Sequence, residues 1–386
     1  MRGIIEAKDV TEAALYLRKQ QFVPIKIEEQ GKKSLFASFM RNKAGTTDLV
    51  FFTRQLSSML SSGLTLMQAL SLLRNQVQNP AMAEVIAGIV ASVEEGKTLS
   101  TSIAKYPKVF SPIYISLLQA AESSGLLDKV LLRLADNLEK AQKLRSTIRS
   151  ALMYPIIVVI MMILVMSIMM IFVIPQLSVL YENLEIELPL ATKIVVGISD
   201  FMILFWPFML GGTVVSFYYF RKWRKTPTGR NIVDAVILRL PIFGKLITQS
   251  VMVEFARTFG LLVGTGSLVV ESLTQSSEVV GNVYYRRAIL EVGSKVEKGV
   301  TIGDAMLSDE LFPSILVEMV KVGEQTGKLD DSLIRVSEYF EREVEQTVKT
   351  LTTAMEPFIM VILAVGVGFL IISIITPIYN LISQIA

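Results

Sequence analysis

The chain contains no histidine and no cysteine among its 386 residues. Histidine is the commonest general base and metal ligand in proteins, and cysteine provides thiolate nucleophiles and disulfides. Without either residue, the usual nucleophilic dyads and most zinc sites cannot form. The phosphate-binding motif G-x-x-x-x-G-K-S/T is also absent, because the glycine-rich run Gly264-Thr-Gly-Ser267 lacks the lysine. These absences predict a protein that is not an enzyme and that has no cofactor.

Charged residues are scarce, at 19% of the chain, whereas apolar residues make up 52% and the mean hydropathy is +0.52. Three long runs, at 155–175, 201–220 and 357–380, have no Asp, Glu, Lys or Arg. Each is long enough to cross the hydrocarbon core of a bilayer as a helix of about 20 residues. The lack of charge inside them excludes an intramembrane aspartyl protease or a proton relay. The sequence therefore predicts three transmembrane helices in a lipid bilayer.

Positive charge is only slightly in excess, with a formal net charge of +3, which does not indicate nucleic-acid binding. The basic residues that matter for topology gather before the first span and after the second: Lys140, Lys143, Arg145, Arg149, Arg221, Lys222, Arg224, Lys225 and Arg230. The connector between these spans is acidic except for Lys193. Because basic residues near span ends stay on the cytoplasmic side, we expect a cytoplasmic N-terminus and an external, periplasmic C-terminus.

Two parts of the chain repeat each other. The motifs of the first copy are Phe52-x-Arg54, Gly63, Gly96-x-Thr98, Glu122-x-x-Gly125-x-Leu127 and Pro155. They return in the second copy as Phe255-x-Arg257, Gly266, Gly299-x-Thr301, Glu324-x-x-Gly327-x-Leu329 and Pro357. The spacing is 203 residues at the start, since 255 − 52 = 203, and 202 at the end, since 357 − 155 = 202. A register held with a single slip indicates the duplication of one module.

No run in either copy alternates convincingly between polar and apolar residues with a period of two. Apolar residues recur at three-to-four spacing, as at Val130, Leu134 and Leu138, which is typical of amphipathic helices. We therefore predict an all-α polytopic membrane protein with two homologous cytoplasmic helical-bundle domains and three transmembrane helices. The expected order is a small N-terminal element and linker at 1–47, helical module 1 at 48–154, the first span at 155–175, an external loop at 176–200, the second span at 201–220, helical module 2 at 221–356, the third span at 357–380 and an external C-terminus at 381–386. A helix is expected within the small element, at 11–20.

Glycines and prolines punctuate both copies at equivalent positions. Gly125 and Gly327 follow a predicted helix and are expected to adopt the left-handed conformation of a C-cap. Pro155 and Pro357 stand at the membrane edge, where each is expected to begin or kink a helix. Asp48 is the expected N-cap of the first long helix. The other repeated glycines are expected to permit positive φ in the turns between helices: Gly63, Gly96, Gly266 and Gly299.

Glu122 and Glu324 occupy equivalent positions near a helix end, where the helix dipole makes a negative charge unfavourable. One interpretation is that each glutamate is only a solvated or capping residue. The alternative is that each one makes a specific interaction, with a cation, with backbone donors of the next helix or with a metal ion. Asp128 and Asp330 lie close in sequence and are candidates to complete such a metal site.

A pair of arginines also repeats, at Arg54 and Arg257 in the first long helix of each copy. We expect these guanidinium groups to form intramolecular ion pairs in preference to contacts with a partner. The acidic run at 341–345 is typical of a solvated helix face. None of these charged residues forms a recognisable catalytic pattern.

This ordered set of motifs resembles the type II secretion system F family, the inner-membrane platform proteins of type II secretion and type IV pilus assembly. The resemblance covers nearly the whole chain and includes Tyr154-Pro155, Leu188-Pro-Leu190 and Thr376-Pro-Ile-Tyr379. It implies a non-enzymatic, multi-pass platform that couples a hexameric cytoplasmic assembly ATPase to the insertion of pilin-like subunits into a filament. It also implies contact with other inner-membrane assembly proteins and with further copies of the chain.

The residues themselves leave one competing class open, a transporter or channel subunit, because internal duplication is common among transporters. Here the duplication lies mainly in the soluble modules, and the spans offer no charged pathway. The two copies differ at Tyr154 against Glu356 and at Ala121 against Gly323. We therefore expect two related modules that meet unequal partners.

Overall fold

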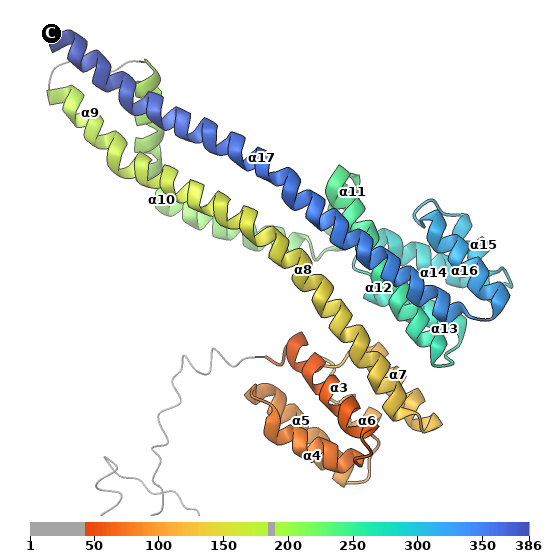
Figure 1. Cartoon of the computed structure of the whole chain (residues 1–386). Helices are drawn as coiled ribbons and strands as arrows, with labels where there is room; N and C mark the ends of the chain where they lie inside the picture. The colour runs from red at the N-terminus through yellow and green to blue at the C-terminus, as the bar shows by residue number, and fades with distance from the viewer. Residues whose placement is uncertain (1–42, 184–189, 386) are drawn as a thin grey trace, which may run out of the picture.

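The computed structural model describes residues 43–183 and 190–385 (Figure 1). Within these residues the regular structure is helical and contains no strand, so the all-α prediction is confirmed. The first half contains α3 (Thr46–Ser61), α4 (Leu66–Gln76), α5 (Pro80–Glu94), α6 (Leu99–Ile103), α7 (Pro112–Ser124), α8 (Leu127–Ile168), the π-helix η1 (Met169–Val173) and α9 (Ile174–Asn183). The second half contains α10 (Leu190–Trp223), α11 (Pro227–Arg239), α12 (Pro241–Gly264), α13 (Val269–Val279), α14 (Val283–Glu297), α15 (Ile302–Leu307), α16 (Ser314–Thr326) and α17 (Leu329–Ile385). The helix expected at 11–20 lies outside the described residues.

The duplication is visible in the positions at which the helices begin. The starts of α4 and α13 differ by 203 residues (269 − 66), as do those of α6 and α15 (302 − 99). The starts of α7 and α16 differ by 202 residues (314 − 112), as do those of α8 and α17 (329 − 127). In the structure, module 1 therefore consists of α3 to α7 with the beginning of α8, and module 2 of α12 to α16 with the beginning of α17.

Each module encloses its own core around a repeated pair of aromatic rings. Phe52 and Phe110 meet edge to face with ring centroids 5.8 Å apart, and Phe255 and Phe312 lie 6.5 Å apart. These are equivalent positions, since 255 − 52 = 203 and 312 − 110 = 202. All four side chains are buried. Because each aromatic side chain buries a large apolar area, this pair anchors the packing of both modules in the same way.

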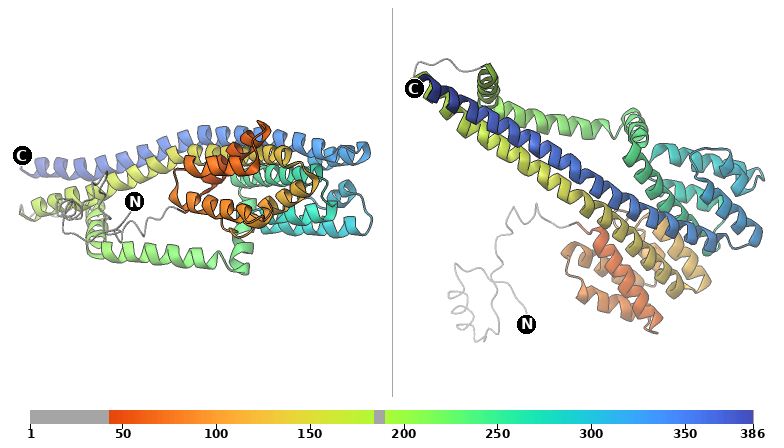
Figure 2. Two further views of the ribbon diagram at one scale, coloured as in Figure 1. Left: turned by 90° about the horizontal axis from the view of Figure 1, so that it is seen from below. Right: turned by 45° about the horizontal axis from the view of Figure 1, so that its top comes forward.

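Two long helices extend from the modules into the apolar part of the molecule. α8 runs through Pro155 and is continued by η1 and α9, and α17 runs through Pro357 without a break. α8 and α17 are in contact, and Figure 1 and Figure 2 show them side by side over much of their length. At about 1.5 Å per residue, the 57 residues of α17 span roughly 85 Å. Neither proline begins a helix.

Large apolar side chains are exposed along the distal parts of these helices and along α10. Phe172 in η1, Phe208 in α10 and Phe358 in α17 are among them. Such extensive apolar exposure is unfavourable in water and favourable in lipid. By length and composition, three stretches among the described residues could cross a membrane: Leu127–Gln176, Pro241–Gly264 and Leu329–Gly368.

The second of these stretches is α12, whose apolar window is 67% buried inside the protein. A membrane span would turn its apolar side chains to lipid, so we assign α12 to the core of module 2. The second span expected at 201–220 falls within α10, where Phe208 and Phe217 are exposed. We therefore retain 201–220 as the predicted second span, and the domain bounds expected from the sequence remain a prediction.

The start of the first helix differs from the expectation. α3 begins at Thr46 with Gly45 as its N-cap, so the expected N-cap at Asp48 is wrong. The Asp48 carboxylate nevertheless accepts a hydrogen bond from the backbone N–H of Gly45 at 2.8 Å and another from the side-chain amide of Asn79 at 2.7 Å. Because Asn79 is the N-cap of α5, one carboxylate stabilises the beginnings of two helices.

The repeated glycines all lie in turns with positive φ: Gly63, Gly96, Gly125, Gly266, Gly299 and Gly327. Gly125 (φ 70°) ends α7 and Gly327 (φ 69°) ends α16, both as left-handed C-caps. The backbone N–H of Leu126 then donates to the carbonyl of Ala121, and that of Lys328 donates to Gly323. A Cβ at either glycine would meet no atom within 4 Å. Only the backbone conformation therefore opposes a side chain there.

Replacing Gly125 or Gly327 with valine should destabilise the protein by about 1–2 kcal/mol or more, because the left-handed conformation brings Cβ close to the following carbonyl oxygen. Asparagine at the same position should cost less, because its short polar side chain tolerates this conformation. The measurement is thermal unfolding of the purified full chain in detergent. Equal melting temperatures for the valine and asparagine variants would contradict the C-cap interpretation.

Candidate functional site

The repeated glutamates join two helix ends within each module. Glu122, in the last turn of α7, accepts hydrogen bonds from the backbone N–H groups of Leu99 and Ser100, the second at 3.1 Å. It also accepts one from the hydroxyl of Ser100. Leu99 is the first residue of α6. The carboxylate at the end of α7 therefore satisfies the free N–H groups at the beginning of α6.

Glu324 makes the same contact in module 2. Its carboxylate oxygens accept hydrogen bonds from the N–H groups of Ile302 at 2.8 Å and Gly303 at 3.2 Å, at the beginning of α15. A negative charge at the unfavourable end of one helix is thus placed at the favourable end of another. Of the alternatives left open by the sequence, backbone donors are the observed partners, and they belong to the preceding short helix and not to the next one.

The four carboxylates considered as metal ligands are placed for other contacts. Within residues 43–183 and 190–385, no group of three or more His, Cys, Asp or Glu side chains is positioned to hold a metal ion. The oxygens of Glu122 and Glu324 accept backbone hydrogen bonds, as described above. Asp128 and Asp330 lie in the first turns of α8 and α17, where a carboxylate stabilises the helix N-terminus.

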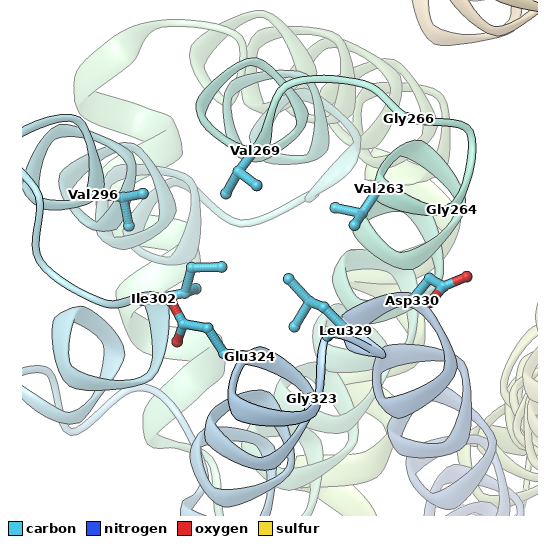
Figure 3. Close-up of a pocket in the computed structure, with 11 residues that line it drawn as sticks. Val263, Gly264, Gly266, Val269, Val296, Ile302, Gly323, Glu324, Leu329 and Asp330 are labelled. Carbon is cyan, nitrogen blue, oxygen red and sulfur yellow. Dashed lines mark hydrogen bonds between the residues drawn. The ribbon is translucent and has the colours of Figure 1, made fainter.

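A cavity of about 570 Å³ lies beside Glu324, at the end of module 2 where α17 begins. Figure 3 shows the aliphatic side chains around it, including Val263, Val269 and Leu329. Asp330 also lines the cavity, but its carboxylate points away from these aliphatic groups (Figure 3). The lining therefore combines aliphatic side chains with the carboxylate of Glu324, which is held by backbone N–H groups.

Arg54 forms an ion pair within module 1, between α3 and α8. Its Nε and Nη2 atoms donate to the two carboxylate oxygens of Glu139 at 2.6 and 2.5 Å, and Nη2 also meets Asp136 at 2.5 Å. The hydrogen bonds with Glu139 raise the pKa of Arg54, and the bond from Arg54 lowers the pKa of Glu139. The side chains remain partly open to water, with 30% of Arg54 exposed.

Arg257 makes the equivalent contact in module 2, since 257 − 54 = 203 and 341 − 139 = 202. Its Nη2 lies 2.8 Å from Glu341, and the side chains of both residues are nearly covered, at 7% and 13% exposed. Burial lowers the pKa of Arg257, against the attraction of Glu341, and burial also raises the pKa of Glu254 on the same helix. Two ion pairs of common origin therefore lie in very different surroundings.

α8 packs on α12 and α17 as well as on module 1. Leu144 of α8 belongs to the core of module 2, and Leu261 and Leu262 of α12 belong to the core of module 1. The contact between α8 and module 2 forms a seam, and three ion pairs cross it: Lys140 with Glu338 at 3.0 Å, Lys143 with Glu345 at 3.5 Å and Arg145 with Glu254 at 3.5 Å. The basic side chains of α8 therefore also join the modules.

Sequence reasoning missed this seam. The expectation of a solvated face at 341–345 does not hold for Glu341, which is buried against Arg257, and Glu343 also accepts a hydrogen bond from Gln249 at 3.1 Å. A signal was present, because Glu139 and Glu341 repeat with the same register as Arg54 and Arg257. The register predicts that each glutamate meets its arginine, but it does not show which of the two pairs is buried.

Two helical modules of common design, joined to long apolar helices, define a duplicated polytopic membrane protein. A sequence model described as "Type II secretion system (T2SS), protein F" matches the chain twice, at residues 52–175 and at residues 255–377. The chain belongs to this family, and the resemblance inferred from the motifs is confirmed. Each match covers most of one module, together with all of the uncharged run at 155–175 or nearly all of the run at 357–380.

Individual relatives come from two kinds of machine. Type IV pilus assembly protein TapC of Aeromonas hydrophila is 34% identical over 380 residues, covering 98% of this chain and 92% of TapC. Type IV pilus assembly protein PilC of Thermus thermophilus is 34% identical over 390 residues, covering 100% and 96%. Type II secretion system protein F of Aeromonas hydrophila is 30% identical over 381 residues, covering 97% and 98%. These names describe assembly and secretion proteins, not enzymes.

Replacing Glu324 with alanine should lower stability by about 1–3 kcal/mol, because two N–H groups at the start of α15 lose their acceptor. Glu324→Gln should cost less, since the amide oxygen can still accept one of the bonds. Glu318→Gln is a matched control on the exposed face of α16 and should leave stability within about 0.5 kcal/mol. The measurement is thermal unfolding of the full chain. An alanine variant as stable as the control would contradict the capping role.

Glu139→Gln and Glu254→Gln should change stability in opposite directions at pH 7. The lowered pKa of Glu139 means that its contribution is present above the ordinary glutamate pKa of about 4.3 and is lost as pH falls through the folded value. The raised pKa of Glu254 means that its contribution is present below about 4.3 and is lost as pH rises through the folded value. Melting curves should therefore show, at neutral pH, that Glu139→Gln is less stable than the unchanged chain and that Glu254→Gln is more stable. Both differences in melting temperature should shrink as the pH falls to 4. Shifts of the same sign at pH 7 would contradict the opposite pKa directions of the two glutamates.

Proposed function

We propose that this protein is a multi-pass platform of the inner (cytoplasmic) membrane in a type IV pilus or type II secretion machine. In this role it couples a cytoplasmic assembly ATPase to the insertion of pilin-like subunits into a filament. The observation that carries the proposal is the double family match, one for each module and its apolar helix. The names of the pilus assembly and secretion relatives support the same role.

The continuous helices provide a mechanical link for this coupling. α8 passes from module 1 into its apolar stretch without interruption at Pro155, and α17 does the same from module 2. Because α8 packs on α17 and forms three ion pairs with module 2, two with α17 and one with α12, a movement of one module acts on both long helices. ATPase movements then turn or tilt the helices and change the surface that the spans present to a pilin-like subunit.

The two modules suit unequal partners on the cytoplasmic side. The ion pair of Arg54 with Glu139 is open to solvent, whereas the pair of Arg257 with Glu341 is nearly covered. Module 1 therefore offers a charged surface at the position that module 2 uses for internal packing. The chain acts with other inner-membrane assembly proteins and with further copies of itself, as the family resemblance implies.

A transporter or channel role has less support. Transport of charged solutes through spans depends on ionisable or polar groups along a pathway, and the runs at 155–175, 201–220 and 357–380 have no Asp, Glu, Lys or Arg. The duplicated part of the chain is mainly the helical modules outside these runs. Ion flux through liposomes that contain the purified chain, abolished by substitutions in the spans, would favour this alternative over the platform.

The lack of cysteine allows the topology to be tested with single introduced thiols. Ser123→Cys in module 1 and Gln176→Cys at the end of the first apolar stretch both replace exposed residues. In spheroplasts, a membrane-impermeant maleimide should label Gln176→Cys and should label Ser123→Cys only after the membrane is permeabilised. This result is expected if the modules are cytoplasmic and the connector is external. Labelling of Ser123→Cys in intact spheroplasts would reverse the proposed orientation.

The coupling role is tested by photo-crosslinking in living cells. A photoreactive residue in place of the exposed Leu72 in module 1 or Leu290 in module 2 should crosslink to the assembly ATPase of the same machine. The matched control is the same residue in place of Phe172, which lies in the predicted first span and should not reach the ATPase. Deleting the gene should abolish filament assembly or secretion. Modules that never crosslink to an ATPase would argue against the proposal.

A further inference from the structure

The short helix α11 follows the predicted second span almost directly. It begins seven residues after the end of that span, since 227 − 220 = 7. The chain turns tightly between α10 and α11, where three consecutive N–H groups, at 224–226, donate to carbonyl groups at the end of α10. In Figure 2, α11 lies across the direction in which α10 and α17 run. If α10 crosses the bilayer, α11 therefore runs along the membrane plane.

Two glycines fix the direction of α11. Gly229, in its first turn, lies so close to the end of α10 that a Cβ would meet the carbonyl oxygen of Trp223 at 2.2 Å. Gly244, in the first turn of α12, lies so close to α11 that a Cβ would meet the carbonyl oxygen of Leu238 at 2.2 Å. Only glycine allows the backbone to approach so closely. α11 is therefore held against the helices before and after it.

One face of α11 is apolar and exposed. Ile232, Val236 and Leu240 follow one another at four-residue spacing, and Phe243, three residues further on, is exposed as well. Each of these side chains is between 43% and 53% exposed. At 13 residues, α11 is too short to cross a bilayer, which takes a helix of about 20. A short helix with one apolar face is typical of a helix that lies in the membrane surface.

The opposite face of α11 belongs to module 2. α11 packs on α12 and α14, and Leu238 lies against the core of the module. Asp234 is buried and accepts a hydrogen bond from the backbone N–H of Val283 at 2.9 Å. Module 2 therefore covers one side of α11 and leaves the apolar row on the other side.

The chain around the apolar row is strongly basic. Residues 221–245 include seven basic residues and one acidic residue, Asp234, which pairs with Arg230 at 3.9 Å. The stretch at 278–287, which contacts α11 through Val283, adds Glu278, Arg286 and Arg287, so the excess stays positive. Five of the seven form no ion pair with any residue that the structure describes: Arg221, Lys222, Arg224, Lys225 and Arg239.

We propose that α11 and the turn before it bind the surface of the bilayer and recognise anionic phospholipids. The row of Ile232, Val236 and Leu240 enters the boundary between headgroups and acyl chains, and the unpaired basic residues meet lipid phosphates. The bilayer is favoured over a second copy or another protein, because this face follows a span directly and is flanked by free positive charge. Since α11 is held against α12, the contact fixes the orientation of module 2 relative to the membrane.

The proposal goes beyond the platform role, and it rests on the predicted second span at 201–220. Its test uses the full chain with one introduced cysteine, labelled with the fluorophore NBD and reconstituted in nanodiscs of phosphatidylcholine and phosphatidylglycerol. Lipids that carry a nitroxide at the headgroup boundary should quench NBD at Val236→Cys, with a shift of its emission to shorter wavelength.

Val322→Cys on α16 is the matched control, because the two valines are 53% and 51% exposed. Val322 lies just before the start of α17. The 28 residues between Leu329 and Pro357 (357 − 329 = 28) separate that start from the predicted membrane edge by roughly 40 Å of helix. The labelled lipids should not quench NBD at this position.

The charge is tested with the probe at position 236. Lys225→Gln combined with Arg239→Gln should lower the quenching about twofold or more when phosphatidylglycerol is present, because each basic residue near an anionic surface adds attraction. The same pair of substitutions should change little in phosphatidylcholine alone. Thermal unfolding of this double variant should match that of the unchanged chain, since both side chains are exposed and unpaired among the described residues.

An NBD group at position 236 that remains in water would overturn the proposal. So would a group that is shielded from water and out of reach of the labelled lipids, which is the result expected when a second copy covers α11. Equal quenching with and without phosphatidylglycerol would overturn the recognition of anionic lipid. Because the nanodiscs contain only lipid and the purified chain, quenching at position 236 supports the proposal whether or not the chain serves a pilus or secretion machine.

Discussion

In each module, one carboxylate holds the end of one helix against the beginning of another, and the rest of the module is arranged around this contact. α6 has 5 residues and α15 has 6, far fewer than the roughly 12–15 that an isolated helix needs in water. Glu122 and Glu324 supply the acceptors that their first N–H groups lack. The left-handed glycine that follows each glutamate then directs the chain into α8 or α17, so the cap and the start of the long helix are coupled.

The duplicated scaffold carries surfaces that have diverged. The same arginine and glutamate positions form a partly exposed pair in module 1 and a nearly buried pair in module 2. A buried ion pair by itself is weak evidence for stability, since the cost of desolvation offsets the attraction. The cavity at the end of module 2 is lined by smaller side chains than module 1 has at two of the equivalent positions, with Val263 in place of Leu60 and Val269 in place of Leu66. One architecture therefore offers two different faces to an assembly machine.

Much of the fold was predictable because its signals are local. The register of the repeat predicted that the helices of both copies begin at equivalent positions, as α4 with α13 and α7 with α16 do. The position of Asp48 was misjudged by a few residues, because an acidic side chain is favoured both at the N-cap and at the third helical position, where it accepts from the backbone N–H of the N-cap residue. The length of α12 and its composition resemble those of a membrane span, and only its burial by neighbouring helices shows that it belongs to a soluble core.

The order of the residues was enough to establish the duplication, the helical class, the uncharged runs and the glycine positions, since periodicity, hydropathy and positive φ are properties of neighbouring residues. The packed fold was needed to show that Glu122 and Glu324 cap the preceding short helix, that Arg257 is buried whereas Arg54 is partly exposed, and that the ends of module 2 leave a cavity. These outcomes depend on groups far apart in the chain, such as Arg145 and Glu254 across the seam. Their distances and burial are set by how whole helices pack, which no local pattern specifies.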